Sequence, residues 1–271
     1  AWTYNPSPTV ISIVPGDGPQ GGGTAIAITG TDFRGTVAVT IDGVACTGVT
    51  VNASSTRIDC VTPPSQTGPG SKDVQISASL SGTILIPNGF VYNITPGIIS
   101  IVPNEGPNQG GQLVVITGTD FVGTINVQFG PNTATVNAVS FDSTRVTVTT
   151  PPFAGVGLVD VGVNSSTNGN VTATSAYTYN APPTFNTCTP NEGPLSGGTP
   201  IVIIGTLFRG VVQVFIDGAP CTGVTVNTTF TRIDCVTPPS PSGQGSKRIT
   251  IVSSLNGTVF SDNAFTYNPA P

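Results

Sequence analysis

The chain has 271 residues, of which 8 are Lys or Arg and 13 are Asp or Glu, so its formal charge is −5 and only 8% of its residues are charged. Phosphate binding needs clustered basic residues, and the nearest such feature, Lys247-Arg248, is too small, which excludes a nucleic-acid-binding protein. No apolar stretch approaches the roughly 18 residues of a membrane span. No signal peptide precedes Ala1 either, which we interpret as a signal already removed or as a fragment of a longer chain.

The chain opens on a short aromatic string, Ala1 to Pro6, and related strings recur at residues 90–93, 177–180 and 264–269. About 87 residues separate one string from the next. Self-similarity at a fixed period indicates units that fold alike and join their neighbours alike. The sequence therefore predicts a surplus terminal strand at 1–7, followed by repeats at 8–95, 96–181 and 182–271.

Four terminal strings serve three repeats, which permits two interpretations of residues 1–7. These residues complete a preceding repeat that this chain lacks, or they complete a sandwich in a neighbouring molecule by strand donation, which would build a filament. Repeats 1 and 3 are closer to each other than to repeat 2, which indicates an alternating period that continues beyond the ends. Both interpretations predict self-association or continuation of a longer repeat array.

Within the first repeat the strand signals are short and evenly spaced. The alternation of Val74, Ile76 and Ala78 with polar residues is typical of a strand with one buried face. Asp42-Gly43 suits a tight turn, and Pro63-Pro64 ends a strand because proline lacks a backbone donor. The expected strands lie at 10–14, 25–29, 37–41, 46–51, 57–61, 74–79, 82–86 and 90–92.

No segment of the chain has a helical period, and the short strands are separated by Gly and Pro in all three repeats. This pattern predicts an all-β fold of three tandem immunoglobulin-like antiparallel β-sandwiches. The joints between repeats are brief and contain Pro96 or Pro182-Pro183, which limits rotation. We therefore expect an extended, semi-rigid array.

The cysteines of the first and third repeats occupy equivalent places: Cys46 and Cys60 correspond to Cys221 and Cys235, and the second repeat has Ala134 and Val148 there. Both members of the pair are replaced together. This is expected for a buried disulfide, because loss of one cysteine alone would leave the other as an unpaired thiol. We predict disulfides joining Cys46 to Cys60 and Cys221 to Cys235, each worth roughly 3 kcal/mol. Such bonds persist in an oxidising compartment, so an extracellular or cell-surface location is expected.

The fifth cysteine, Cys188, aligns with Ile13 and Ile101 and is expected as a free thiol in an apolar core position. A metal site is the alternative interpretation of the cysteines. It would need more ligands than two thiols, and the chain has no His.

Candidate N-glycosylation sites follow from the Asn-x-Ser/Thr triplets, and covalent glycans would keep a charge-poor surface soluble. Asn5 is excluded because a proline follows it. Asn52 and Asn227 recur at equivalent places, which favours these two. The six acceptors are Asn52, Asn93, Asn164, Asn170, Asn227 and Asn256.

Each repeat opens with the same phrase, which in the first repeat comprises Pro15, Gly18, Pro19, Gly22, Gly23, Thr24, Ile26, Ile28, Gly30 and Phe33. The second repeat has Pro103, Gly106, Gly110, Gly111, Val114, Ile116, Gly118 and Phe121, and the third has Pro190, Gly193, Gly197, Gly198, Thr199, Ile201, Ile203, Gly205 and Phe208. With the closing Thr-Pro-Pro and Phe-x-Tyr, this resembles the IPT/TIG domain family of plexin-type receptors, transcription factors and bacterial surface proteins. The resemblance implies an immunoglobulin-like fold and carries over no catalytic residues.

No enzyme site is expected. Without His, triads of the Ser or Cys type lack their usual base. Asp17, Glu105 and Glu192 occupy one turn position in three separate repeats, so we interpret them as structural caps rather than paired acids. Calcium at the joints is the alternative, but Asn93 and Asn180 with few carboxylates offer too few oxygens. The sequence predicts neither metal nor cofactor.

Two functions are compatible with such a chain. The first is a non-enzymatic extracellular structural element, part of a fibre, stalk or surface filament. The alternative is a cell-surface adhesion or receptor ectodomain that binds a protein or glycan through its loops. A receptor is expected to expose a loop that breaks the repeat pattern, and the visible breaks are Phe230, where repeat 1 has Ser55, and Phe153 after the second Pro pair.

Overall fold

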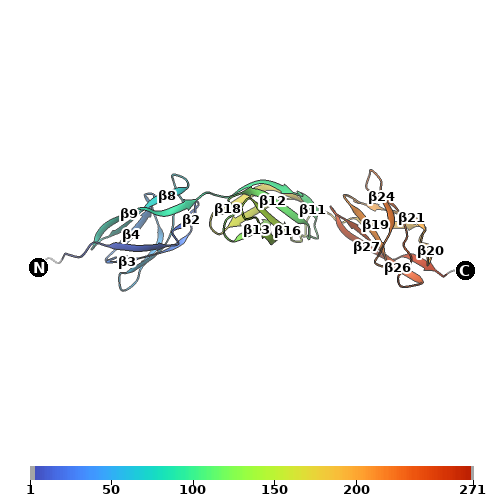
Figure 1. The fold of residues 1–271 in the computed structure, drawn as a ribbon, viewed down its shortest axis with the longest axis horizontal. Coiled ribbons are helices and arrows are strands. Elements are labelled where there is room, and N and C mark those ends of the chain that lie inside the picture. Colours follow the sequence, from blue (N-terminus) through green and yellow to red (C-terminus); the bar gives the residue numbers. More distant parts are fainter. Residues whose placement is uncertain (1–3, 270–271) are drawn as a thin grey trace.

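The computed structural model describes residues 4–269. Three β-sandwiches follow one another in a row, with the first and third repeats at opposite ends of an extended array (Figure 1). The described residues contain strands and no helix. The predicted fold class is confirmed.

Repeat 1 consists of two sheets whose strand orders are β1-β3-β7-β6 and β2-β9-β8-β4-β5. Its strands are β1 (Thr9–Val14), β2 (Asp17–Pro19), β3 (Ala25–Thr31), β4 (Val37–Ile41), β5 (Val44–Ala45), β6 (Thr47–Val51), β7 (Arg57–Val61), β8 (Gly70–Ala78) and β9 (Gly82–Asn93). All pairings are antiparallel except that of β2 with β9, which is parallel. The cis proline Pro15 lies where the chain leaves the first sheet for the second.

Repeats 2 and 3 have the same topology. Repeat 2 comprises β10 (Gly97–Val102), β11 (Glu105–Pro107), β12 (Leu113–Thr119), β13 (Ile125–Phe129), β14 (Asn132–Thr133), β15 (Thr135–Val139), β16 (Arg145–Thr149), β17 (Gly157–Ser165) and β18 (Gly169–Asn180). Repeat 3 comprises β19 (Thr184–Thr189), β20 (Glu192–Pro194), β21 (Pro200–Thr206), β22 (Val212–Ile216), β23 (Ala219–Pro220), β24 (Thr222–Val226), β25 (Arg232–Val236), β26 (Gly245–Ser253) and β27 (Gly257–Asn268).

Each repeat has a hydrophobic core of its own between its two sheets. In repeat 1, Ile26 and Ile28 of β3 point inward, and Val74 and Ile76 of β8 face them from the other sheet. Phe33 belongs to the same core and is fully buried. Burial of such a side chain stabilises the fold by about 1.5–3 kcal/mol, and each repeat buries its own set of these side chains.

Two recurring sequence motifs meet inside each sandwich. The hydroxyl of Tyr92 donates to the carbonyl oxygen of Pro63 at 2.5 Å, and Tyr179 and Tyr267 make the same bond to Pro151 and Pro238 at 2.8 and 2.6 Å. A buried phenol needs such an acceptor. The Thr-Pro-Pro and Phe-x-Tyr strings therefore recur together, because the proline carbonyl accepts the hydrogen bond of the buried tyrosine hydroxyl.

Two glycines of the opening phrase are needed for close backbone approach. Gly22 has a φ of 73°, and a Cβ there would overlap the backbone of Pro63. Gly30 lies against the carbonyl oxygen of Thr9 and the ring of Phe33, so a Cβ there would overlap both. These contacts explain why the phrase keeps glycine at both places.

The strand predictions for repeat 1 differ from the structure in three respects. The strand expected at 46–51 begins at Thr47, as β6, and Cys46 separates it from the short strand β5, which was not expected. The strands expected at 82–86 and 90–92 are one strand, β9, whose partner register shifts between Lys72 and Val74. Asn88 has a φ of 54° at this irregularity, and its N–H donates to Asp73 Oδ1 at 2.9 Å. The short parallel strand β2 was not expected, because three residues carry too little alternation to reveal a strand.

Candidate functional site

The joints between repeats are the parts of the array where side chains of different repeats meet. At the joint between repeats 2 and 3, which we call joint 2–3, Asn180 ends β18. Its Nδ2 donates to Glu105 Oε2 at 3.0 Å and to the carbonyl oxygen of Leu255 in the β26–β27 hairpin at 3.0 Å. One amide thus ties the last strand of repeat 2, the short strand β11 and a hairpin of repeat 3 together.

Arg209 of repeat 3 completes this cluster. Its guanidinium lies 3.2 Å from Glu105 Oε2 and 3.5 Å from Asn180 Oδ1. Both charged side chains are about one-third exposed, at 33% and 30%. An ion pair this exposed contributes only about 0–1 kcal/mol, so its main effect is on orientation.

Two further contacts hold joint 2–3. Gln109 Nε2 donates to the carbonyl oxygen of Thr258 at 3.0 Å, and the N–H of Thr258 donates to Gln109 Oε1 at 2.9 Å. Asn256 Nδ2 donates to the carbonyl oxygen of Ala181 in the linker at 2.7 Å. Since these bonds reach backbone atoms, they restrain the orientation of repeat 3 relative to repeat 2.

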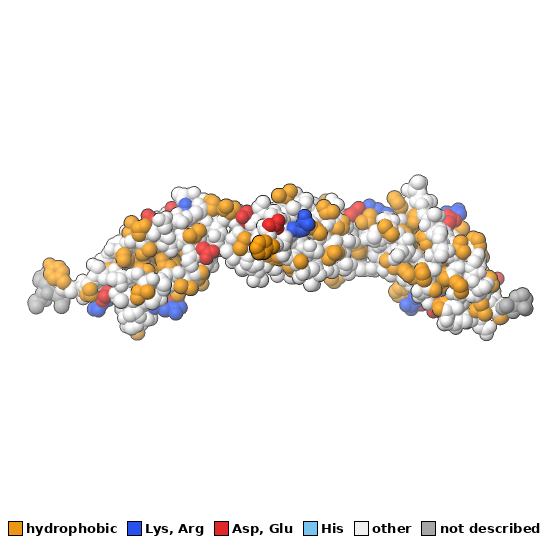
Figure 2. All heavy atoms as spheres, in the orientation of Figure 1, with side chains coloured by type: hydrophobic (Ala, Val, Ile, Leu, Met, Phe, Trp, Pro, Cys, Tyr) orange, Lys and Arg blue, Asp and Glu red, His pale blue; other side chains and the backbone are white. Residues whose placement is uncertain are grey.

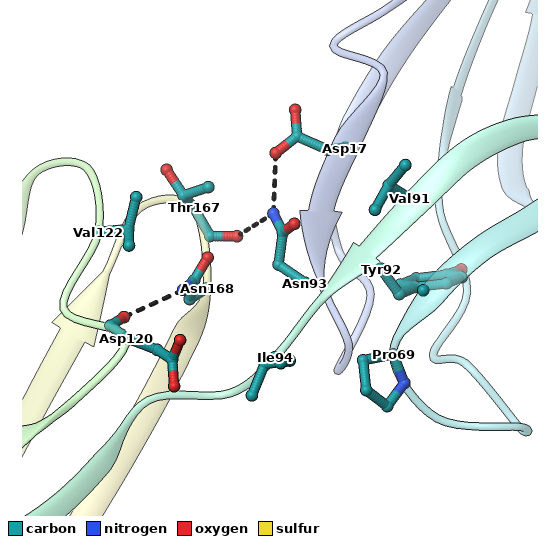
Figure 3. A pocket seen from close by; sticks show the side chains of 11 residues that line it. Asp17, Pro69, Val91, Tyr92, Asn93, Ile94, Asp120, Val122, Thr167 and Asn168 are labelled. Carbon is teal, nitrogen blue, oxygen red and sulfur yellow. Dashed lines mark hydrogen bonds between the residues drawn. The ribbon is translucent and has the colours of Figure 1, made fainter. Parts of the chain in front are cut away.

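The joint between repeats 1 and 2, joint 1–2, has the same plan with fewer contacts. Asn93 Nδ2 donates to Asp17 Oδ2 at 2.8 Å and to the carbonyl oxygen of Thr167 at 3.2 Å (Figure 3). Val122 stands where repeat 3 has Arg209, and Gly21 stands where repeat 2 has Gln109. A cleft of about 680 Å³ lies beside Asn93, lined by residues of both repeats.

Half of the same arrangement is found at each end of the array. Asn5 Nδ2 donates to the carbonyl oxygen of Leu80, the counterpart of Thr167 and Leu255, at 2.9 Å. At the other end, Asn268 Nδ2 donates to Glu192 Oε2 at 3.1 Å. Residues 4–7 form no strand, and residues 1–3 lie outside the described residues, so the predicted surplus strand remains a proposal.

The sequence interpretation placed Asn93 and Asn180 at the joints but missed the contacts that they make there. It treated Asp17, Glu105 and Glu192 as caps of separate turns, and the carboxylates do lie in separate repeats. The available signal was that each carboxylate has an asparagine partner about 75 residues later, Asn93, Asn180 and Asn268. Only the parallel pairing of β2 with β9 and of its counterparts brings the two together.

Cys46 and Cys60 are buried side by side in repeat 1, and Cys221 and Cys235 are buried in the same way in repeat 3. They are free thiols in this structure, so the predicted disulfides remain a proposal. A hydrogen bond between the thiols of Cys46 and Cys60, together with burial, raises the pKa of Cys46 well above its ordinary value. Cys221 beside Cys235 shows the same effect. Ala134 and Val148 fill the equivalent core places in repeat 2.

Cys188 packs against the core of repeat 3, as Ile13 and Ile101 do in their own repeats. Burial raises the pKa of its thiol to about 12. At neutral pH the group is therefore a neutral, weakly reactive thiol.

The recurring glycosylation candidates Asn52 and Asn227 sit at β-hairpin tips. Asn52 is exposed, and its Oδ1 accepts from the N–H groups of Thr56 and Arg57 at 2.8 and 3.0 Å. Asn227 repeats this turn with Thr231 and Arg232. Asn52 is exposed and Asn227 is half-buried, and the Nδ2 of each donates to hydroxyl groups of its own turn.

The other four candidates fall into two classes. Asn164 and Asn170 are exposed and directly opposite each other on β17 and β18. Asn93 uses its Nδ2 in joint 1–2. Asn256 is only 1% exposed, and its Nδ2 is bonded across joint 2–3. The prediction of a glycan on Asn256 conflicts with this burial, so we no longer propose one there.

The loop aromatics differ from expectation. Phe153 is not an exposed break in the pattern, because its ring packs on Tyr179 at a centroid distance of 5.0 Å. Phe230 is 43% exposed with a φ of 58°. Phe141, at the tip of the β15–β16 hairpin, is fully exposed and was not singled out from the sequence. Single exposed aromatics carry no binding site by themselves.

The surface is poor in charge. In Figure 2 most of the visible atoms belong to uncharged polar groups or backbone, with small isolated groups of acidic and basic side chains. Arg57 Nη2 lies 2.7 Å from Asp59 Oδ1, and the hydrogen bond from Arg57 lowers the pKa of this carboxyl. Within residues 4–269 no three His, Cys, Asp or Glu side chains gather as a metal site. None of these residues belongs to a helix that could cross a membrane.

Comparison with known proteins gives the family and fold. The IPT/TIG domain description matches residues 8–92, 96–179 and 183–267. Human fibrocystin-L is 28% identical over 268 residues, which is 96% of this chain and 6% of that protein. The contact site A protein of Dictyostelium discoideum is 27% identical over 275 residues, covering 97% of this chain and 52% of that protein. Zebrafish (Danio rerio) plexin A3 is 30% identical over 190 residues, covering 65% and 10%.

Among solved structures, the plexin A4 full extracellular region matches with a TM-score of 0.50 and 21% identity, over 99% of this chain and 25% of that one. This likeness shows the fold alone. The chain spans 6 to 52% of the curated relatives described above.

Proposed function

The chain belongs to the IPT/TIG domain family, in three tandem copies, and from that premise we propose that it is a non-enzymatic segment of a cell-surface receptor or adhesion ectodomain. Its three repeats act as a semi-rigid spacer that holds binding loops at defined separations. The receptor and adhesion proteins among its relatives support this role.

The observation that carries the proposal is the recurrence of one joint. Asn5, Asn93 and Asn180 each donate from Nδ2 to the same hairpin carbonyl of the following repeat, those of Leu80, Thr167 and Leu255. A flexible string of domains needs no such bond. Because Asn5 makes it too, we propose that residues 1–7 are the end of a preceding repeat of a longer array, with the repeats divided near residues 8–95, 96–181 and 182–271.

Small-angle X-ray scattering of the intact chain tests the spacer role. The expected result is a single extended rod whose length changes little with temperature below unfolding. Substituting Asn180 by Ala removes two bonds of joint 2–3 and should broaden the distribution of lengths, while Asn268→Ala, which touches no following repeat, serves as control. A wild-type chain that is as compact or as variable as the Asn180→Ala variant would contradict the proposal.

A fibre built from many copies is the second candidate. The observation in its favour is that Glu192 and Asn268 present at one end the counterparts of Glu105 and Asn180, the pair that receives Arg209 at joint 2–3. At the other end Arg34, the counterpart of Arg209, is half exposed and bonded to Asp32. Sedimentation velocity over a wide concentration range separates the two candidates. A fibre-forming chain should grow head to tail, whereas a spacer should stay monomeric.

A further inference from the structure

The cleft at joint 1–2 corresponds to a place that is filled at joint 2–3. At joint 2–3 the guanidinium of Arg209 lies against Glu105 and Asn180. At joint 1–2 the matching carboxylate and amide, Asp17 and Asn93, are present and bonded to each other, but Val122 replaces the arginine. The two joints therefore contain the same carboxylate–amide pair, with a cation in place at joint 2–3 and open space at joint 1–2.

A second carboxylate adds to the negative charge of the open cleft. Asp120 lines it from repeat 2, whereas repeat 3 has Leu207 at that position. Among the described residues the Asp120 carboxylate has no ion-pair partner, although in repeat 1 the equivalent Asp32 binds Arg34 at 2.9 Å. Figure 3 shows Asp17 on the repeat-1 side and Asp120 on the repeat-2 side, with Asn93 between them.

The rest of the lining is mixed. Ile94 of the linker and Val122 are exposed, and Val91, Pro69 and Tyr92 add to this apolar part of the wall. Gly70, Thr167 and Asn168 supply the polar part. Two carboxylates above apolar side chains suit a guanidinium better than a compact ammonium, because a guanidinium is weakly hydrated, planar and able to bridge two carboxylates. The cleft of about 680 Å³ has room for such a side chain and its neighbours.

We propose that this cleft is a binding site for an arginine side chain of a partner protein, flanked in the partner by apolar residues. The inference rests on the proposed ectodomain role, since it names the partner chemistry of that ectodomain. Asn93 Nδ2 already uses both hydrogens, for Asp17 and Thr167, so a glycan on Asn93 would compete with this site.

The probes for the test are N-acetyl-arginine amide, its neutral isostere N-acetyl-citrulline amide and N-acetyl-lysine amide. Their binding to the intact chain is measured by the change in its amide NMR shifts. The arginine probe should shift Asn93, Asn168 and Val122 with a Kd on the order of 1 mM, and the citrulline probe about tenfold more weakly. Asp17→Asn and Asp120→Asn should each weaken binding severalfold. Equal binding of the arginine and citrulline probes would overturn the proposal.

A matched pair of variants supplies the control. Val122→Arg places an arginine where Arg34 and Arg209 stand in the other repeats, so the fold should tolerate it, and it should abolish probe binding. Arg209→Ala should open a second, weaker site at joint 2–3, seen as shifts of Asn180. If Val122→Arg binds the probe as wild type does, the cleft is not the site. The rod length measured by scattering would be unaffected by that failure, so it would leave the spacer role intact.

Discussion

Gln109 and Thr258 form two hydrogen bonds across the joint between repeats 2 and 3, with Nε2 donating to the carbonyl oxygen at 3.0 Å and the backbone N–H donating to Oε1 at 2.9 Å. The side-chain amide thereby imitates the rung of a β-ladder between two domains. Repeat 1 has Gly21 at the corresponding place, so joint 1–2 lacks this rung. Bending of the array is accordingly expected at joint 1–2.

Exchanging the joint residues should move the flexible point. In the variant Gln109→Gly, Arg209→Val, joint 2–3 carries the residues of joint 1–2, and scattering should show an array that bends at both joints. The reverse variant, Gly21→Gln with Val122→Arg, should stiffen joint 1–2, since a Cβ at Gly21 meets nothing within 4 Å. The free energy of unfolding should change by only about 0–1 kcal/mol in either case. Unchanged length distributions in both variants would show that the linkers alone set the stiffness.

Disulfide formation should be confined to repeats 1 and 3. In oxidised material, reduction should lower the free energy of unfolding of these two repeats by roughly 3 kcal/mol each and leave repeat 2 unaffected. The double substitution Cys46→Ala with Cys60→Val, which copies repeat 2, should fold without sensitivity to reductant in repeat 1. Thiol titration of the unreduced chain in denaturant should find one thiol, Cys188. Finding five would refute the disulfides.

The two tyrosines of β18 should respond oppositely to loss of their hydroxyls. The Tyr177 hydroxyl is buried without a partner in good hydrogen-bond geometry, and repeats 1 and 3 have Phe90 and Phe265 there. Tyr177→Phe should therefore raise the free energy of unfolding of repeat 2 by about 1 kcal/mol. Tyr179→Phe leaves the Pro151 carbonyl without its hydrogen-bond donor and should lower this free energy by about 1–2 kcal/mol. Thermal unfolding of the two variants checks the sign, and equal losses would mean that both hydroxyls are bonded.

High pH should unfold repeat 2 first. Burial raises the pKa of Tyr92, Tyr177 and Tyr267 to about 12, and it also raises the pKa of Tyr179. A phenol whose pKa is higher in the folded than in the unfolded chain adds stability below pH 10, and this stability is lost as the pH rises through about 12. Repeat 2 has two such phenols and each neighbour has one. Absorbance of phenolate with circular dichroism should detect this order, and simultaneous loss of all three repeats would count against it.

Glycan attachment should follow exposure of the asparagine. In material secreted by eukaryotic cells, peptide mapping after enzymatic deglycosylation should report conversion of the exposed Asn52, Asn164 and Asn170 to Asp, with less conversion of the half-buried Asn227. Asn256 should stay unmodified because its amide is buried in joint 2–3. Asn256→Gln is the informative control: it should loosen the joint without changing the glycan mass. A glycan on Asn256 would mean that joint 2–3 opens during synthesis.

Most of the fold could be predicted from the repeat pattern. A strand with one buried face must alternate apolar and polar residues, and this alternation occurs in all three repeats. Val74, Ile76 and Ala78 are buried as expected, and the period identifies each core without any knowledge of pairing. Strand β2 was missed since its stability comes from parallel pairing with β9, a partner about 75 residues away. The periodicity of a short segment does not indicate a pairing partner that is distant in the sequence.

The candidate site was less predictable for the same reason. Asn93 looked like a glycosylation acceptor and Asp17 like a turn cap, because each residue type has those roles when considered alone. Their contact depends on the parallel register of two strands, and the cleft beside them depends on which residue the next repeat places opposite. Aligning the repeats on both carboxylate and asparagine would have revealed the pair, whereas Val122 in place of Arg209 acquires meaning only once the two joints are compared.

The parallel pairing of β2 with β9 has a mechanical consequence. In each repeat the chain reaches the first of these strands through β1 or its counterpart and leaves from the C-terminal end of the second. In repeat 1, Asp17, Gly18 and Pro19 are in register with Val91, Tyr92 and Asn93. Tension applied along the array therefore slides the two strands past each other and loads their bonds simultaneously instead of unzipping them one by one. A cell-surface protein built from such units would resist pulling forces best along its own long axis.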